Sequence, residues 1–167
     1  EGNNEIAQSE LAMAFENSGK DPLEVYRKRY EDNPGNLSYG IDYADRLGEA
    51  DRAEDAIPIL QQVIKLDPSS KIAYRKLAET NISIDALEAG AKAYEELFKI
   101  DPRDVRVAIN ISDVYLDNSD YRQAIKWADK ATDIDSKSAD ALGQKGKGYY
   151  DGWDHFRQNP FTIDDRL

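Results

Sequence analysis

Three carboxylates recur in this sequence at an interval of 34 residues, at Asp45, Glu79 and Asp113. A structure that repeats with the same period would stack them into one row. A row of acids favours a ligand that carries Lys or Arg, or a peptide whose amides can donate hydrogen bonds. Arginine, amide and apolar side chains accompany the row, and the full set of candidate partner-binding residues is Ile41, Asp45, Arg75, Glu79, Arg106, Asn110 and Asp113.

An alternative interpretation is that these side chains are ordinary solvated surface residues. Arg75 and Glu79 are four residues apart, the spacing of a helical ion pair. An exposed pair of this kind contributes only about 0–1 kcal/mol to stability. The acids do not have the loop spacing of oxygen ligands that calcium needs, so the sequence predicts no metal site.

Catalytic chemistry has little support in the sequence. The chain has no cysteine, and its single histidine, His155, has no serine, acid or metal-ligand partner at a telling distance. A loose cluster of glycines at residues 143–152 follows no strand and matches no phosphate-binding spacing. We therefore expect a protein that is not an enzyme and uses no cofactor.

Charge narrows the class of partner. The 167 residues carry a net charge of −11, which disfavours nucleic acid and anionic membranes as partners. Residues 1–70 hold 15 acids and 7 bases, and residues 71–167 hold 18 and 15. If the partner is a basic protein or peptide, the N-terminal half is therefore the better place for it. The alternative interpretation is that the net charge only keeps the protein soluble. No apolar stretch is long enough to span a membrane.

The elements that must position these residues show the same period. A dipeptide of Asn or Asp followed by Pro recurs every 34 residues, at Asn33-Pro34, Asp67-Pro68 and Asp101-Pro102. Asp135-Ser136 continues the series without the proline. Self-similarity at this interval is typical of stacked helical hairpins. Two residues further on stand good helix N-caps, Asn36, Ser70, Asp104 and Ser138. Each should open the first helix of a hairpin.

The second helix of each hairpin has its own predicted start. An Asp followed three residues later by Glu or Gln is a variant of the capping box, and it occurs at Asp21, Asp51, Asp85 and Asp120. Between the caps the apolar residues follow the helical period. Small residues recur where paired helices must approach closely, at Ala44, Ala78 and Ser112 in the first helices and at Ala56, Gly90 and Ala124 in the second.

This spacing resembles the tetratricopeptide repeat family. The family pattern of large, large, small, large, then small, aromatic, small and Pro is met by Gly40, Tyr43, Ala44, Leu47, Ala56, Leu60, Val63 and Pro68, and again by Tyr74, Leu77, Ala78, Asn81, Gly90, Tyr94, Leu97 and Pro102. The resemblance covers about residues 5–150. It implies an all-α superhelix, a solenoid of stacked antiparallel hairpins whose first helices line a concave groove.

The resemblance also implies a function, which is to bind a peptide or protein segment in that groove. Some family members hold the C-terminal carboxylate of chaperones with Lys, Asn and Arg on successive first helices. The matching positions here are Ile41, Asp45, Lys76, Arg106 and Asn110. Ile41 and Asp45 do not supply the Lys-Asn pair, and Asp45 would repel a carboxylate, so we do not expect this chain to be such a clamp.

The expected domain organisation has repeats at about residues 5–36, 37–70, 71–104 and 105–138 and a partial one from 139. We expect Gly152 and Asn159-Pro160 to interrupt helix after residue 150, which leaves 151–167 as an aromatic tail or as the cut end of a last hairpin that Thr162 and Asp165 would cap. An exposed solenoid end would favour self-association into a homo-oligomer. Trp127 is open to two interpretations, a contact on the convex face or packing against Trp153 or Phe156.

Overall fold

The described part of the chain is α-helical throughout. The computed structural model describes residues 21–158, apart from the side chain of Phe156. These residues form eight helices and no strand: α2 (Pro22–Asp32), α3 (Leu37–Glu49), α4 (Ala53–Leu66), α5 (Lys71–Ser83), α6 (Leu87–Ile100), α7 (Val105–Asp117), α8 (Tyr121–Ile134) and α9 (Ala139–Gln158). The prediction of an all-α chain is confirmed.

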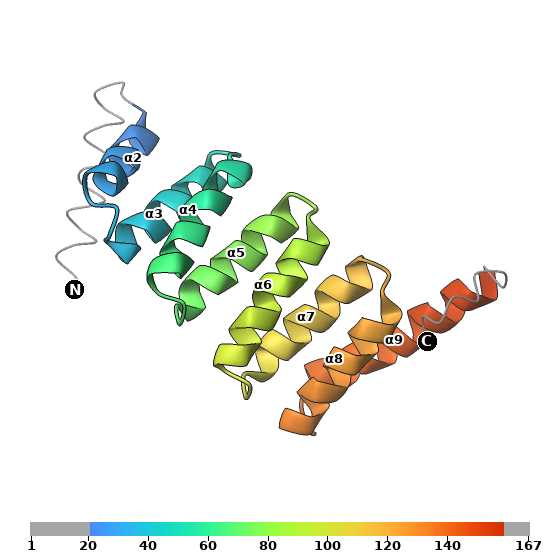
Figure 1. Ribbon diagram of the computed structural model, residues 1–167. Helices are drawn as coiled ribbons and strands as arrows, with labels where there is room; N and C mark the ends of the chain where they lie inside the picture. The colour runs from blue at the N-terminus through green and yellow to red at the C-terminus, as the bar shows by residue number, and fades with distance from the viewer. Residues whose placement is uncertain (1–20, 159–167) are drawn as a thin grey trace. The chain divides into compact units, whose positions relative to one another are not determined.

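The helices group into two compact units that divide after Pro68. Unit 1 contains α2, α3 and α4, and unit 2 contains α5 to α9. Within the units, consecutive helices pack side by side as hairpins, α3 with α4, α5 with α6 and α7 with α8 (Figure 1). In each hairpin a turn of three residues joins the two helices.

The first helices begin at the predicted caps. Oδ1 of Asn36 accepts a hydrogen bond from the Ser38 amide at 3.1 Å, and Oδ1 of Asp104 accepts from the Arg106 amide at 3.0 Å. The hydroxyls of Ser70 and Ser138 each accept from the amide three residues on, at 3.4 Å and 3.2 Å. These short side chains satisfy amides that the helix itself leaves unpaired.

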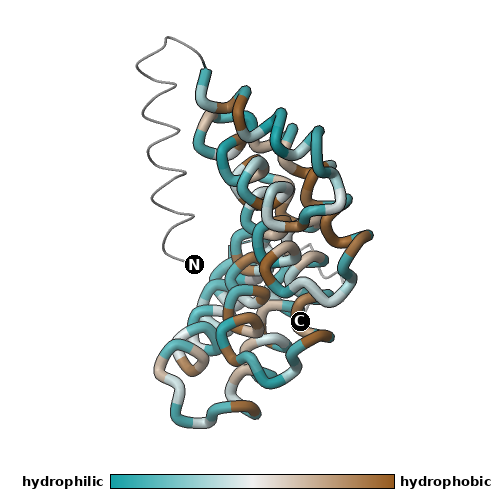
Figure 2. Tube along the Cα trace, turned by 90° about the vertical axis from the view of Figure 1, so that its left-hand side faces the viewer, coloured by the Kyte–Doolittle hydropathy of each residue, from teal (hydrophilic) through white to brown (hydrophobic). Residues whose placement is uncertain are grey.

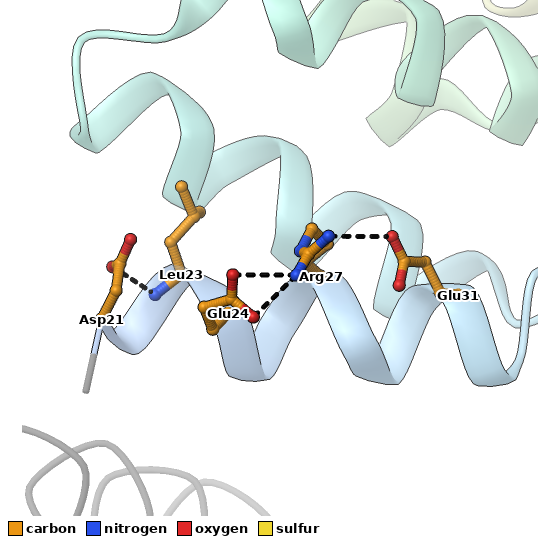
Figure 3. A network of polar contacts seen from close by, with 5 residues as sticks. All are labelled: Asp21, Leu23, Glu24, Arg27 and Glu31. Atoms are coloured by element: carbon orange, nitrogen blue, oxygen red, sulfur yellow. Dashed lines mark hydrogen bonds and ion pairs between the residues drawn. The ribbon is translucent and has the colours of Figure 1, made fainter. Parts of the chain in front are cut away.

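The cap of α2 is the earliest one that the structure describes. Oδ1 of Asp21 accepts from the Leu23 amide at 2.9 Å, as Figure 3 shows. Along the exposed side of α2, Arg27 lies between Glu24 and Glu31, with Nη2 2.7 Å from Oε2 of Glu24 and Nη1 3.6 Å from Oε1 of Glu31. The predicted start at Asp21 is confirmed.

The predicted starts of α4 and α6 are wrong by one residue. Asp51 and Asp85 do not cap these helices, because both have the left-handed backbone conformation, with φ of 56° and 61°. The N-caps are Arg52 and Ala86, and neither makes a side-chain capping bond. In the third hairpin Ser119 takes the left-handed position with φ of 58°, so the predicted Asp120 is the N-cap of α8.

A shared hydrogen bond explains this shift. The amide after each left-handed residue donates to a carbonyl five residues back: Arg52 to Leu47 at 2.8 Å, Ala86 to Asn81 at 2.9 Å and Asp120 to Tyr115 at 2.9 Å. This is the Schellman ending of a helix, which requires a left-handed residue just before the donor. Asp and Ser serve there because short polar side chains tolerate that conformation better than bulky ones.

The core of unit 2 depends on small residues at helix contacts. Ala78 and Ser112 are fully buried in α5 and α7, and the Ser112 hydroxyl donates to the Ala124 carbonyl of α8 at 2.8 Å. A Cβ on Gly90 would lie only 2.6 Å from Cγ1 of Ile82. The predicted close approach of paired helices is therefore present. Figure 2 shows hydrophobic and hydrophilic residues interspersed along the helices, as expected for helices with one buried side.

Trp127 belongs to this core, and its predicted contact on the convex face was wrong. Its predicted packing against Trp153 or Phe156 stays a prediction, since the side chain of Phe156 lies outside the described part of the chain. Trp127 is buried rather than available on a convex face. Its ring meets Phe98 of α6 edge-on with centroids 5.1 Å apart, and Nζ of Lys130 lies 3.6 Å from the Trp127 ring centroid. The contact therefore joins α8 to α6.

The predicted break at Gly152 was also wrong, whereas the one at Asn159-Pro160 lies outside the described residues. α9 runs through Gly152 to Gln158, so it has 20 residues where α5 and α7 have 13. In the 34-residue register, Trp153 stands where Asp51, Asp85 and Ser119 make the left-handed turn. A bulky aromatic residue is poorly suited to that conformation, which explains why the helix continues.

The remaining expectations about the ends are not decided by the described residues. The first helix of the earliest repeat and the predicted cap at Thr162 and Asp165 lie outside residues 21–158. The division of the chain at residue 150 stays a prediction. Within the described residues, none of the helices combines the length and apolarity that a membrane span requires.

Candidate functional site

The seven predicted partner-binding residues all lie on first helices of hairpins. Ile41 and Asp45 lie on α3 in unit 1, and both are half-buried. The other five lie in unit 2, Arg75 and Glu79 on α5 and Arg106, Asn110 and Asp113 on α7. Glu79 and Arg106 are exposed, whereas the remaining three are half-buried.

In unit 2 three of these residues influence the phenol of Tyr94. Tyr94 belongs to α6 and is buried. Burial raises the pKa of Tyr94 above its ordinary value, and the Glu79 carboxylate raises it further. The Arg75 guanidinium and a side-chain hydrogen bond with Asn110 lower that pKa. The hydroxyl of Tyr94, on α6, is thus influenced by side chains of α5, the preceding helix, and of α7, the following one.

Sequence reasoning placed Tyr94 in the core and missed this polar role. The signal was available in the repeat, because Leu60 and Ala128 occupy the equivalent positions 34 residues before and after it. Only the tyrosine adds a hydroxyl to the same apolar position. Its ring packs in the core cluster of unit 2 while its oxygen reaches the polar side chains.

Arg75 has an acidic neighbour of its own. Its Nη2 lies 3.6 Å from Oδ2 of Asp104, the N-cap residue of α7. Both side chains are partly exposed, so the pair contributes only about 0–1 kcal/mol. Its main effect is to connect α5 with the start of α7 and to offset part of the positive charge of Arg75.

Asp113 is not an open carboxylate, because two side chains of α9 approach it. Nε2 of Gln144 donates to Oδ1 of Asp113 at 2.9 Å, and Nζ of Lys147 lies 3.9 Å from the same oxygen. Sequence reasoning missed both, although Gln144 follows Asn110 by 34 residues and Lys147 follows Asp113 by 34. The series of acids at intervals of 34 residues, Asp45, Glu79 and Asp113, is therefore followed by a lysine at the next equivalent position.

On α3, burial and neighbouring charges shift the pKa of Asp42, which lies between the predicted residues Ile41 and Asp45 in the sequence. Burial raises the pKa of Asp42, and the neighbouring Asp45 carboxylate adds to the increase, while Arg29 and Arg46 oppose it. Asp45 therefore lies close enough to Asp42 for the two charges to interact. All four of these side chains belong to unit 1.

The chemistry that unit 2 offers is recognition by charge and hydrogen bonding. Its first helices present an exposed carboxylate at Glu79, an exposed guanidinium at Arg106 and an amide at Asn110. Among residues 21–158 no three His, Asp or Glu side chains gather as metal ligands would. His155 is exposed, and its ring centroid lies 5.5 Å from that of Tyr121.

Comparisons with known proteins agree with the helical-repeat fold described above. The model of the family described as "Tetratricopeptide repeat" matches residues 42–96 and 84–139, which together make up more than half of the chain. A mitochondrial pentatricopeptide repeat-containing protein of Arabidopsis thaliana is 31% identical over 97 residues, 58% of this chain and 16% of that protein.

Solved structures of two helical-repeat proteins are similar in fold. A crystal structure of MamA matches with a TM-score of 0.64 and 17% identity over 89% of this chain and 94% of that one. YrrB, described as a TPR protein with an unusual peptide-binding site, matches with a TM-score of 0.58 and 16% identity, covering 83% of this chain and 76% of its own. The predicted class of helical-repeat solenoids is confirmed, and the chain belongs to the tetratricopeptide repeat family.

Proposed function

We propose that this protein is a non-enzymatic scaffold that binds an extended segment of another protein on its first-helix face. Membership of the tetratricopeptide repeat family supports a protein-interaction role in general. The peptide-binding site named for YrrB, a protein of similar fold, supports a peptide ligand. Neither comparison assigns the residues or the partner, so these are argued from the side chains of the chain itself.

The observation that carries the proposal is that the charges of Arg75 and Glu79 act on the buried phenol of Tyr94, to which Asn110 is hydrogen-bonded. The three residues come from two first helices, α5 and α7, on either side of the helix that carries the tyrosine. The Asn110 side chain, held by its hydrogen bond, would lose less conformational freedom on binding than a freely moving surface residue. A peptide that crosses α5 and α7 would find donors and acceptors already in place.

The chemistry of the face favours a peptide with a cationic side chain. Glu79 is exposed and is the acid best placed to receive a Lys or Arg, because Asp113 already has Gln144 and Lys147 beside it. Arg106 and Asn110 would donate to the backbone carbonyls of the peptide. The net charge of −11 would attract a basic partner.

Fluorescence anisotropy with labelled short peptides tests this proposal. Three pools of random peptides, enriched in Lys and Arg, in Asp and Glu, or in neutral residues, are titrated with the protein. We expect the cationic pool to bind most tightly. Glu79→Lys should weaken that binding at least tenfold, which corresponds to about 1.4 kcal/mol.

The matched control is Glu96→Lys, an equal change of charge on the second helix α6, where Glu96 pairs with Lys99 in an exposed i,i+3 contact. It should retain binding. Equal affinity for the three pools, or an equal loss in both variants, would contradict the assignment of this face.

A further inference from the structure

The last helix exposes a stripe of large apolar side chains. Leu142, Tyr149, Trp153 and Tyr150 of α9 are 51%, 55%, 64% and 73% exposed. Leu142, Gly146, Tyr149 and Trp153 follow one another at intervals of four, three and four residues, so they share one side of the helix, and Tyr150 adjoins it. We call these five residues the α9 stripe. Aromatic residues grouped in this way are enriched in protein interfaces.

In the earlier hairpins the equivalent side of the first helix is covered. Ala108 and Ser112 precede Leu142 and Gly146 by 34 residues, and both are fully buried. α8 provides the cover, since the Ser112 hydroxyl bonds to the Ala124 carbonyl of that helix. On α9, by contrast, Gly146 is exposed, and a Cβ there would meet nothing within 4 Å.

The turn that brings a second helix onto the first one in the earlier hairpins is missing from α9. In the three hairpins a left-handed residue ends the first helix and returns the chain as the second helix. Trp153 takes that position here, and α9 continues for five more residues to Gln158. The α9 stripe is therefore not covered by a second helix that begins after a left-handed turn at residue 153.

A second copy of the chain fits the stripe in area. An aromatic side chain can bury about 150–250 Å², so the exposed parts of the stripe amount to roughly 500 Å² in each copy. Two stripes packed together would bury about 1,000 Å², near the lower limit for a specific interface. This predicts a weak and reversible dimer.

Charge also fits a second copy. α9 has three acids and three bases, Asp140, Asp151, Asp154 and Lys145, Lys147, Arg157, and is neutral within a chain of −11. Its first ten residues hold two bases and one acid, and its last ten hold two acids and one base. Two such helices attract each other only when they run antiparallel.

We propose that two copies of the chain form a homodimer by antiparallel packing of their α9 stripes. The two-fold axis passes between Tyr149 and Tyr150, so that Trp153 of each copy lies over Gly146 of the other. At the rim of the contact, Lys147 of each copy then turns from Asp113 of its own chain to Asp154 of the other, and Asp154 exchanges its contact with Arg157 for this one. Such an interface is self-complementary, as two-fold symmetry requires. It does not depend on the proposed peptide-binding role.

Sedimentation equilibrium of the whole chain, from about 1 µM to about 1 mM, measures the association. We expect a monomer–dimer equilibrium with a dissociation constant in the range of tens to hundreds of µM. Tyr150→Glu should weaken it at least tenfold, and so should Tyr149→Glu. Leu66→Glu is the control, because it adds the same charge at a 47% exposed leucine on α4. Circular dichroism establishes that each variant remains helical.

A mixing experiment tests the antiparallel geometry. Lys147→Glu and Asp154→Lys should each weaken self-association, because both rim pairs become like-charged. An equimolar mixture of the two variants should associate more tightly than either alone, since both pairs are then restored. If net charge alone governed association, Asp154→Lys would strengthen it.

The outcomes decide the proposal. A monomer at all concentrations overturns it and leaves the stripe to another occupant, such as residues 159–167 or a helix of a different protein. A dimer that Tyr149→Glu and Tyr150→Glu leave unchanged also overturns it. A mixture that associates no better than its components overturns the antiparallel arrangement.

Discussion

At the scale of single residues, partial burial sets the electrostatics of the first-helix face. Asp42 is half-buried on α3, and burial raises its pKa above the ordinary value of 3.8, with a further contribution from Asp45. Arg29 and Arg46 offset part of this increase. The folded chain therefore binds the Asp42 proton more tightly than the unfolded chain does.

A pH-dependent effect on stability follows from that difference. A raised pKa contributes stability that is fully present below the unfolded value, near 3.8, and is lost as the pH rises through the folded value. Asp42→Asn removes the charge and should stabilise the protein at pH 7 by up to about 1 kcal/mol, a small effect because solvent screens a half-buried group.

Urea unfolding of the two proteins at pH 7 and at pH 3 checks this. The advantage of Asp42→Asn should be present at pH 7 and should disappear at pH 3, where the wild-type carboxyl is protonated. A variant that is less stable at pH 7 would show that the charge of Asp42 is stabilised by its arginine neighbours.

At the scale of the elements, glycine has two different roles in helices of unit 2. Gly90 of α6 lies where α5 approaches, with Cγ1 of Ile82 2.6 Å and the Ala78 carbonyl oxygen 3.2 Å from the position that a Cβ would take. Gly143 of α9 has nothing within 4 Å of that position. One glycine allows helices to pack, and the other only makes its helix more flexible.

Substitution of each glycine by alanine should therefore have opposite effects. Gly143→Ala should stabilise the protein by about 0.5–1 kcal/mol, because alanine favours the helix. Gly90→Ala gains the same propensity but forces the helices apart, and it should destabilise by about 1–2 kcal/mol overall. Thermal unfolding of the two variants, followed by circular dichroism at low protein concentration, provides the comparison. Stabilisation by both would show that α5 and α6 yield at this contact at little cost.

At the scale of the whole molecule, the net charge of −11 acts on the two proposed interactions in opposite directions. It attracts a cationic peptide to the face that contains Glu79. It also repels a second copy of the chain, although α9 itself is neutral. Added salt screens both effects, because the Debye length falls from about 10 Å at 0.1 M to about 3 Å at 1 M.

Salt should thus separate the two activities. Between about 0.1 M and about 1 M sodium chloride, the affinity for Lys- and Arg-rich peptides should fall several-fold. Over the same range, self-association through the apolar α9 stripe should become tighter. Anisotropy titrations and sedimentation equilibrium in the same buffers measure both quantities. If both affinities fell with salt, the attraction between Lys147 and Asp154 at the rim of the dimer would outweigh the repulsion between the net charges of the two copies.

The local sequence was sufficient for the helices and for most of their ends. The 34-residue period, the caps at Asn36, Ser70, Asp104 and Ser138, and the small residues at helix contacts were all predictable, because each depends on a side chain and its near neighbours in the chain. The starts at Asp51 and Asp85 were not, since the left-handed turn moves the cap by one residue.

The sequence by itself determined the fold class and placed the seven candidate residues on first helices, because helical periodicity and a repeat register are properties of spacing. Only the tertiary structure decided which side chains meet. It placed the Tyr94 phenol where Asn110 bonds to it and the charges of Arg75 and Glu79 act on it, gave Asp113 its contacts with α9 and buried Trp127 against Phe98. These are contacts between residues far apart along the chain, and they depend on how whole helices pack and on where the last helix fails to turn.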